Sequence, residues 1–235
     1  MDVLAEQASI KSWFDETYKK KKFKYLRSQN AYELFPTLLQ AQPGEKHLDV
    51  ACGLGLMIRS MTNRGLESYG VDLSDEAIRQ GKLYCPDGNL QVGNAEVLPF
   101  EDETFDHITC LGSLERMLNR PKAIQEQVRV GKKHAKYCFM VRNSEHFIWR
   151  FFLKPLGLDN KKGHQDALNL EQWTLLFESC GLKTRKVYRD HWPFYRSISF
   201  IWPFKIDYSK ERRFFLPLSW AYEYIFVLEK DKPNG

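Results

Sequence analysis

The sequence of 235 residues has no long hydrophobic run and no clustered cysteines. No apolar stretch approaches the roughly 20 residues that a membrane-spanning helix needs, so we expect no such helix. The five cysteines are scattered, without a CxxC pair or a Cys/His cluster, which predicts neither a disulfide framework nor a metal site. The first residues include acids and lack the apolar core of a signal peptide. We therefore expect a cytoplasmic protein with reduced thiols.

The glycine loop in residues 47–55 lacks the neighbours that define two common nucleotide sites. A dinucleotide fingerprint would have a third glycine where this chain has Ile58. A P-loop would have a Lys-Ser or Lys-Thr pair after the loop, and this pair is absent. Gly53 and Gly55 still let a ligand approach the backbone closely. The loop, placed between a predicted strand and a predicted helix, therefore suits a nucleoside without phosphate.

An acidic residue follows the loop at an informative distance. Asp72 ends a second apolar stretch and lies 19 residues after Gly53. This is close to the spacing at which an acid on the second strand of a dinucleotide-binding fold receives the ribose hydroxyls. The sequence therefore predicts a nucleoside site with Asp72 at its ribose.

Residues 47–55, 71–74 and 92–106 together resemble three motifs of class I S-adenosylmethionine-dependent methyltransferases of the type 11 group. The third stretch contains the Leu-Pro-Phe segment at residues 98–100. The motifs occur in the expected order, and the resemblance is strong over roughly residues 40–142. It implies that S-adenosylmethionine is the cofactor and that a substrate heteroatom attacks its sulfonium methyl group in line.

The resemblance also implies a role for each motif residue. Asp72 would bind the ribose hydroxyls, Leu73 would lie on the adenine, and Asn94 with Ala95 would bind the adenine edge. Leu111 would border the methionine part, which the glycine loop would surround. The residues expected at the cofactor are Asp49, Ala51, Cys52, Gly53, Gly55, Asp72, Leu73, Asn94, Ala95 and Leu111.

Two residues depart from the family pattern, and two roles stay open. Ala51 replaces a glycine, which we expect to be tolerated with a negative φ. Asn94 replaces an acid, and its carbonyl oxygen can still accept a hydrogen bond from the adenine amino group. The alternative role of Asp49 is to orient the loop alone, and the alternative role of Leu73 is ordinary core packing.

The acceptor side is less well defined by the sequence. In residues 113–117, Arg116 stands where relatives often have histidine, and Glu115 precedes it. An unactivated hydroxyl would need a base that titrates near neutrality, for which His146 and His164 are candidates, although loop histidines are more often surface residues. The remaining histidines, at positions 47, 107, 134 and 191, are expected to be structural. The residues expected to contact substrate are Glu115, Arg116, Asn143 and Trp192.

The alternation of strands and helices predicts an α/β fold with a Rossmann-like, doubly wound, mostly parallel sheet of seven strands. A ligand of such a sheet lies beyond the carboxyl ends of the strands, where all three motifs fall. The resemblance implies an antiparallel edge for the last two strands. We expect strands at residues 46–50, 67–71, 90–92, 106–110, 136–141, 182–188 and 222–228.

Several helix boundaries have local signals. Ser74 is expected to cap a helix whose first turn is acidic. Pro121 is expected at the first position of another helix. Asn169 and Gln172 have capping-box spacing, and Gly181 is expected to close the helix that they start.

We expect one domain, residues 1–235, with a helical N-terminal lid (1–43), a cofactor-binding core (44–142) and a substrate-side half (143–235). An aromatic-rich insertion, residues 189–220, precedes the last strand. Its aromatics suit an accessory core or substrate lid, and together with its lysines and arginines they also suit a cover for a lipid-linked acceptor at a membrane surface.

The N-terminal segment contains aromatic residues and a basic cluster. The resemblance implies that Tyr18 or Tyr25 faces the cofactor, although simple packing on the core is the commoner role of such residues. Lysines occupy residues 19–22 and 24 around Phe23. They suit a solvated helix face or contact with an anionic surface such as lipid headgroups.

The sequence favours a methyltransferase that acts on a small-molecule, glycan or lipid-linked acceptor, with O-methylation as the expected reaction. One alternative is a catalytically silent binding module that keeps the fold. A nicotinamide-dependent oxidoreductase is disfavoured by Ile58 and by the segment at residues 98–100. No nucleic-acid partner is expected, and peripheral membrane contact is consistent with the basic cluster.

Overall fold

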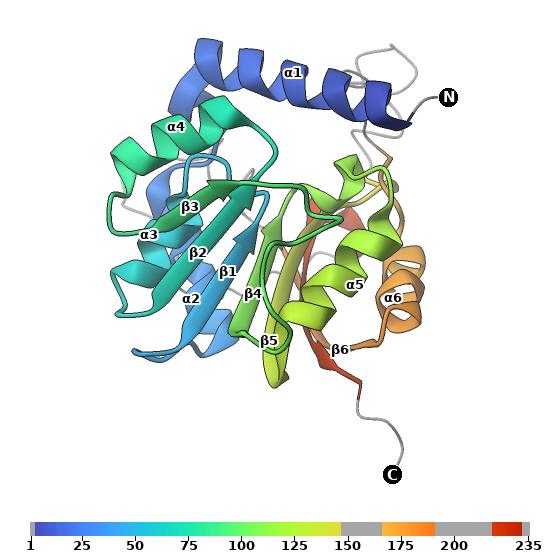
Figure 1. The fold of residues 1–235 in the computed structure, drawn as a ribbon. Coiled ribbons are helices and arrows are strands. Elements are labelled where there is room, and N and C mark those ends of the chain that lie inside the picture. The colour runs from blue at the N-terminus through green and yellow to red at the C-terminus, as the bar shows by residue number, and fades with distance from the viewer. Residues whose placement is uncertain (1–2, 147–165, 191–217, 232–235) are drawn as a thin grey trace, which may run out of the picture.

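The computed structural model describes residues 3–146, 166–190 and 218–231, drawn in colour in Figure 1, and the statements below concern these residues. Seven strands form one sheet in the order β3-β2-β1-β4-β5-β7-β6. The first five strands are parallel, and β7 pairs antiparallel with both β5 and β6. The predicted Rossmann-like sheet and its antiparallel edge are therefore confirmed. The strands are β1 (Lys46–Val50), β2 (Glu67–Asp72), β3 (Asn89–Val92), β4 (Phe105–Leu111), β5 (Gly131–Arg142), β6 (Leu182–Arg189) and β7 (Glu223–Lys230).

The helices begin where their capping residues predict. The Ser74 hydroxyl accepts a hydrogen bond from the Ala77 N–H, and Asn169 forms the expected capping box with Gln172. Pro121 is the second residue of its helix, one position later than expected, because the helix begins at Arg120. The α-helices are α1 (Val3–Lys21), α2 (Leu34–Leu39), α3 (Leu56–Thr62), α4 (Asp75–Tyr84), α5 (Arg120–Val130) and α6 (Leu170–Ser179). Short 3-10 turns are η1 (Lys22–Tyr25), η2 (Gln29–Tyr32), η3 (Leu114–Arg116) and η5 (Leu218–Trp220).

Side chains of β5 alternate between the two faces of the sheet. Cys138 and Met140 pack with α2 and α3 on one face. Phe139 and Val141 pack with α5 and α6 on the other. Because successive side chains point to opposite faces, both faces of the strand are buried.

None of the helices among the described residues has the length and hydrophobicity to cross a bilayer.

Strand β5 begins five residues earlier than predicted, at Gly131 in place of residue 136. Helix α5 runs directly into it, and Gly131 pairs with Phe105 ahead of an irregularity in the β4–β5 register. A Cβ at position 131 would collide with the hydroxyl of Tyr137. Glycine therefore permits the close contact with Tyr137. The strand start was predicted too late because glycine has a weak strand propensity.

Helix α1 lies across the edge of the sheet at which β1 and β2 end (Figure 1). It is fixed to the start of α4: Asp15 accepts hydrogen bonds from the Ser74 hydroxyl at 2.5 Å and from the Glu76 N–H at 3.3 Å. Further along, the Gln80 side chain donates to the Tyr18 carbonyl at 3.1 Å. The helical N-terminal region is confirmed, and α1 covers the carboxyl edge of the sheet.

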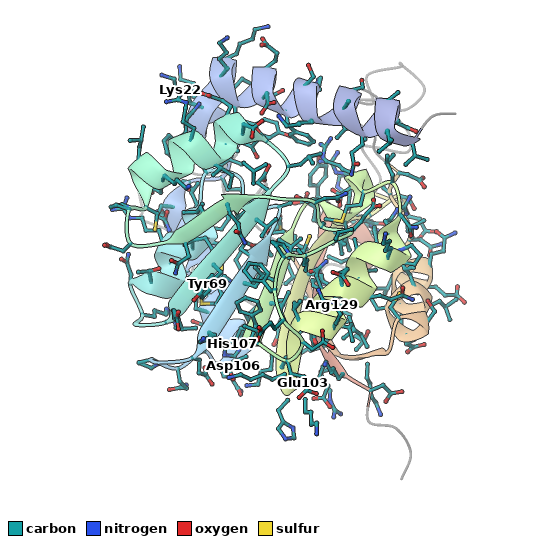
Figure 2. All side chains as sticks on the ribbon, viewed as in Figure 1. Lys22, Tyr69, Glu103, Asp106, His107 and Arg129 are labelled. Carbon is teal, nitrogen blue, oxygen red and sulfur yellow. The ribbon has the colours of Figure 1, made fainter. Side chains whose placement is uncertain are left out.

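The loop that follows β3 is held to α5 by Arg129, whose side chain is labelled in Figure 2. The guanidinium donates to the carbonyls of Phe100 at 2.8 Å and Leu98 at 3.0 Å. It also pairs with Asp102 at 2.7 Å and with Glu126 at 2.8 Å. One planar group with five donors therefore fixes the loop in several places.

Candidate cofactor and acceptor site

Two adjoining cavities lie between α1 and the carboxyl ends of the strands. The larger has an empty volume of about 680 Å³ and the smaller about 450 Å³, both with open solvent at the mouth included. The residues that line both are Phe14, Tyr18, Ala51, Ser113 and Arg116.

The larger cavity gathers residues from the second and third motifs. Asp72 and Leu73 line it from the end of β2, and Asn94 and Ala95 line it from the loop after β3. The Asn94 side-chain oxygen accepts a hydrogen bond from the Glu96 N–H at 3.0 Å, which leaves its second lone pair for a ligand. An acid beside small apolar surfaces suits a nucleoside.

Asp72 joins the glycine loop to the start of α4. Its Oδ2 accepts a hydrogen bond from the Gly53 N–H at 2.8 Å, and its Oδ1 accepts one from the Ser74 N–H at 2.9 Å. Burial raises the pKa of the Asp72 carboxyl to about 6, although both backbone donors act against this rise. The carboxylate thus has two fixed oxygens at the cavity wall, each with a further lone pair for a hydroxyl group.

The smaller cavity is lined by residues of the first motif and has Asp49 in its wall. Cys52, Gly53 and Leu111, which the resemblance assigns to the cofactor, also line it. Thr109 donates a hydrogen bond to Asp49 Oδ1 at 2.6 Å. Burial, the largest effect on this group, raises the pKa of the Asp49 carboxyl to about 7. A buried carboxylate at this wall favours a cationic ligand group, since a cation would offset the cost of ionisation.

The two loop glycines have different roles. Gly53 has a φ of +53°, and a Cβ there would lie 2.8 Å from the Tyr18 hydroxyl oxygen. The loop therefore needs glycine for its contact with α1 as well as for a ligand. Gly55, with a φ of +79°, precedes the first turn of α3 and lines neither cavity, so its role in the structure is conformational.

The condition under which alanine was expected to be tolerated at position 51, a negative φ, is not met, because the structure has a φ of +60° there. This conformation turns the chain after β1 so that the Cys52 N–H donates to the Val71 carbonyl at 3.0 Å. The left-handed conformation costs an L-residue roughly 1–2 kcal/mol. The glycine of the family pattern would avoid this cost.

We expect Ala51→Gly to raise the free energy of unfolding by about 1 kcal/mol, because relief of strain exceeds the added entropy of the unfolded chain. Urea denaturation measures the change. The matched control is Ala95→Gly, at a position outside the left-handed region, which should lower stability by about 0.5–1 kcal/mol. A loss of stability in Ala51→Gly would contradict this account of the turn.

The residues predicted to contact the methyl acceptor do not all line the cavities. Arg116 lines both cavities, and its guanidinium lies over the rings of Trp13 and Phe14 at 5.6 and 5.5 Å. Glu115 and Asn143 are buried and line neither cavity. The Asn143 amide donates to the Ala221 carbonyl at 2.9 Å, which fixes a turn. Of the three predicted substrate contacts among the described residues, Arg116 is thus the best placed.

The base candidates gain little support from the described geometry. The His146 ring packs edge-on against Tyr222 at 5.3 Å between ring centroids and lines neither cavity. Burial lowers the pKa of His146. His164, Trp192 and most of the insertion at 189–220 lie outside the described residues. Figure 2 places His107 at the edge of the sheet away from α1, which fits its predicted structural role.

Some lining residues were missed by sequence reasoning. Ile10 and Phe14 line the larger cavity together with Tyr18. Their spacing of four residues puts them on one face of α1, and this periodicity was the available signal. Tyr25, for which packing was the commoner expectation, lines the smaller cavity.

A buried ion cluster lies at the carboxyl edge of the sheet, where β6 ends and β7 begins. Arg27 makes two hydrogen bonds of 2.9 Å to the Asp190 carboxylate and pairs with Glu223. Arg142 lies 3.9 Å from Glu223. The cluster ties the segment after α1 to the end of β6 and the start of β7.

The described residues fit S-adenosylmethionine. Asp72 suits its ribose, the apolar surfaces of Leu73 and Ala95 suit its adenine, and Asp49 suits the ammonium group of its methionine part. The close contact of Tyr18 with Gly53 would cover a ligand in the loop. Within the described residues no group of three or more His, Cys, Asp or Glu side chains is arranged to hold a metal ion.

Comparisons with known proteins agree with this fit. Residues 48–139 match the model of a methyltransferase domain family. The chain is 35% identical over 96 residues to a demethylmenaquinone methyltransferase of Renibacterium salmoninarum, covering 41% of this chain and 40% of the relative. It is 30% identical over 173 residues to a ubiquinone biosynthesis O-methyltransferase of Hahella chejuensis, covering 62% of this chain and 71% of the relative. Other quinone-biosynthesis relatives are named C-methyltransferases.

The fold comparison covers more of the chain. A solved S-adenosylmethionine-dependent methyltransferase of Thermotoga maritima has a TM-score of 0.67 at 16% identity, over 94% of this chain and 99% of that one. At this identity the likeness shows the fold alone. Taken with the sequence matches and the motif geometry, it shows that the chain belongs to the class I S-adenosylmethionine-dependent methyltransferases of the type 11 group.

Proposed function

We propose that this chain transfers a methyl group from S-adenosylmethionine to a small phenolic acceptor, by O-methylation. The observation that carries the proposal is the pair of adjoining cavities, one suited to a nucleoside and one to an amino acid, with Arg116 in the wall that they share. When bound, S-adenosylmethionine supplies an electrophilic methyl group on a sulfonium centre. The names of the relatives point to aromatic quinone precursors as the first acceptors to test.

The residues of the chain would mainly bind and orient the two partners. Asp72 and Asp49 would hold the two ends of the cofactor, and Tyr18 on α1 would cover it and exclude water. This assigns the N-terminal segment a lid role. Arg116 would face the acceptor and stabilise a phenolate, because a nearby cation lowers the pKa of a phenol. An acceptor ionised in this way needs no histidine base.

The test uses methyl-labelled S-adenosylmethionine with a panel of catechol-type and hydroxyquinone-type acceptors, and detects both S-adenosylhomocysteine and labelled product. We expect Arg116→Ala to lower kcat/KM by about 100-fold or more, while binding of S-adenosylhomocysteine changes little. Arg116→Lys should retain part of the activity. If Arg116→Ala weakens S-adenosylhomocysteine binding instead, Arg116 holds the cofactor. Binding without turnover on any acceptor would favour the silent module.

A lipid-linked acceptor would require contact with a membrane, which we propose is made by the end of α1 and by η1. The lysines of residues 19–22 and 24 are exposed, and Phe23 beside them is 42% exposed. Basic residues beside a partly exposed aromatic suit an anionic bilayer. Cosedimentation with vesicles rich in phosphatidylglycerol, reduced by salt and by Phe23→Ser, is the expected result. Equal sedimentation with neutral vesicles would contradict it.

A further inference from the structure

A chain of buried hydrogen bonds runs through the sheet behind Asp49. The Ser68 hydroxyl on β2 lies 2.7 Å from His47 Nδ1 on β1, and His47 Nε2 lies 2.9 Å from the Thr109 hydroxyl on β4. Thr109 in turn lies 2.6 Å from Asp49 Oδ1. All four side chains are at most 4% exposed. The register explains the contacts, since Ser68 pairs with His47 and Thr109 pairs with Asp49.

The donors in this chain all point towards Asp49 when that group is ionised. A carboxylate only accepts, so the Thr109 hydroxyl gives its one hydrogen to Asp49. Thr109 then accepts from His47, which places the ring hydrogen on Nε2. Burial lowers the pKa of His47 to about 3, so the ring is neutral and Nδ1 accepts from Ser68. The connections therefore fix both the tautomer of His47 and the rotamer of Thr109.

We propose that His47 and Thr109 are positioning residues that hold Asp49 Oδ1 in the sheet and leave Oδ2 for the ammonium group of the cofactor's amino-acid part. This inference rests on the proposed function. Asp49 is an acidic residue that lines the smaller cavity. If its carboxylate rotated, Oδ2 would no longer face the ammonium group of a ligand in that cavity. A role confined to satisfying buried polar atoms would stabilise the fold without favouring one ligand over another. Ligand preference therefore distinguishes the two roles.

The test measures calorimetric affinity for two ligands that share the nucleoside. S-adenosylhomocysteine carries the ammonium group, and 5′-methylthioadenosine lacks the amino-acid part. We expect Thr109→Val to weaken binding of the first by about 10- to 100-fold, the range for loss of a hydrogen bond to a charged group, and the second by less than about twofold. Thr109→Ser, which keeps the hydroxyl, should bind both ligands as the wild type does.

A second pair of variants keeps the test decisive if Thr109→Val does not fold. His47→Gln retains an N–H donor for Thr109 and should preserve the preference for S-adenosylhomocysteine, whereas His47→Leu removes the donor and should reduce that preference. Equal effects on both ligands, or no effect on either, would overturn the inference and leave a structural role. If the wild type binds neither ligand, the proposed function itself fails.

Discussion

Replacement of Asp72 by alanine is expected to weaken binding of S-adenosylhomocysteine by about 100-fold or more. The change removes the proposed acceptor of the ribose hydroxyls. It also frees the N–H groups of Gly53 and Ser74, which are held at 2.8 and 2.9 Å. Hydrogen bonds to a charged group contribute roughly 1.5–3 kcal/mol each. Loss of the two bonds from the ribose hydroxyls therefore gives at least about a 100-fold decrease in affinity. Isothermal titration calorimetry on folded protein measures the effect.

The matched control for this variant is Asp87→Ala, which removes the same charge at an exposed position after α4. It should bind S-adenosylhomocysteine with the affinity of the wild type. Asp72→Asn should bind almost as weakly as Asp72→Ala, because the amide would present an N–H group to one of two backbone donors. An affinity of Asp72→Ala within about threefold of the wild type would contradict the assignment of this carboxylate to the ribose.

Arg27→Ala is expected to cause the largest loss of stability, about 3–5 kcal/mol, because it removes the guanidinium that pairs with the buried carboxylates of Asp190 and Glu223. For a chain of this size the loss corresponds to a decrease in Tm of roughly 6–20 °C. Differential scanning calorimetry measures it. The next residues towards the N-terminus, Tyr25 and Leu26, line the smaller cavity, so cofactor affinity should fall as well.

Two further variants separate charge from packing at this cluster. Arg27→Lys keeps the charge but loses the paired hydrogen bonds to Asp190, and should lose part of the stability. A triple variant, Arg27→Met with Asp190→Asn and Glu223→Gln, removes the charges of these three side chains while Arg142 keeps its own, and should recover part of the stability. If Arg27→Ala unfolds at the temperature of the wild type, the cluster does not hold the end of the sheet.

Sequence patterns were most informative where structure depends on neighbouring residues. The caps at Ser74 and Asn169 were predictable because their partners lie three residues away. The positions of Asp72 and Asn94 in one cavity were predictable because parallel strands end at the same edge of a sheet. These features need only local signals and a fold class.

Features that depend on packing between distant segments were not predictable. The φ of Ala51 is set by pairing of the next residue with β2, and the role of Phe14 depends on how α1 docks on α4. His47 was expected to be only structural, because nothing in the sequence places it between Ser68 and Thr109. The strand register creates that contact, and with it the proposed link to Asp49.

The most direct test of the central claim is thermal unfolding of the wild-type protein with S-adenosylmethionine, S-adenosylhomocysteine and NAD in parallel. A ligand at about 100 times its Kd stabilises the folded state by roughly 2.7 kcal/mol, which for a chain of this size is a rise in Tm of about 5–11 °C. We predict this rise with both adenosyl ligands and none with NAD. No rise with either adenosyl ligand at millimolar concentration, or a rise with NAD alone, would contradict the account.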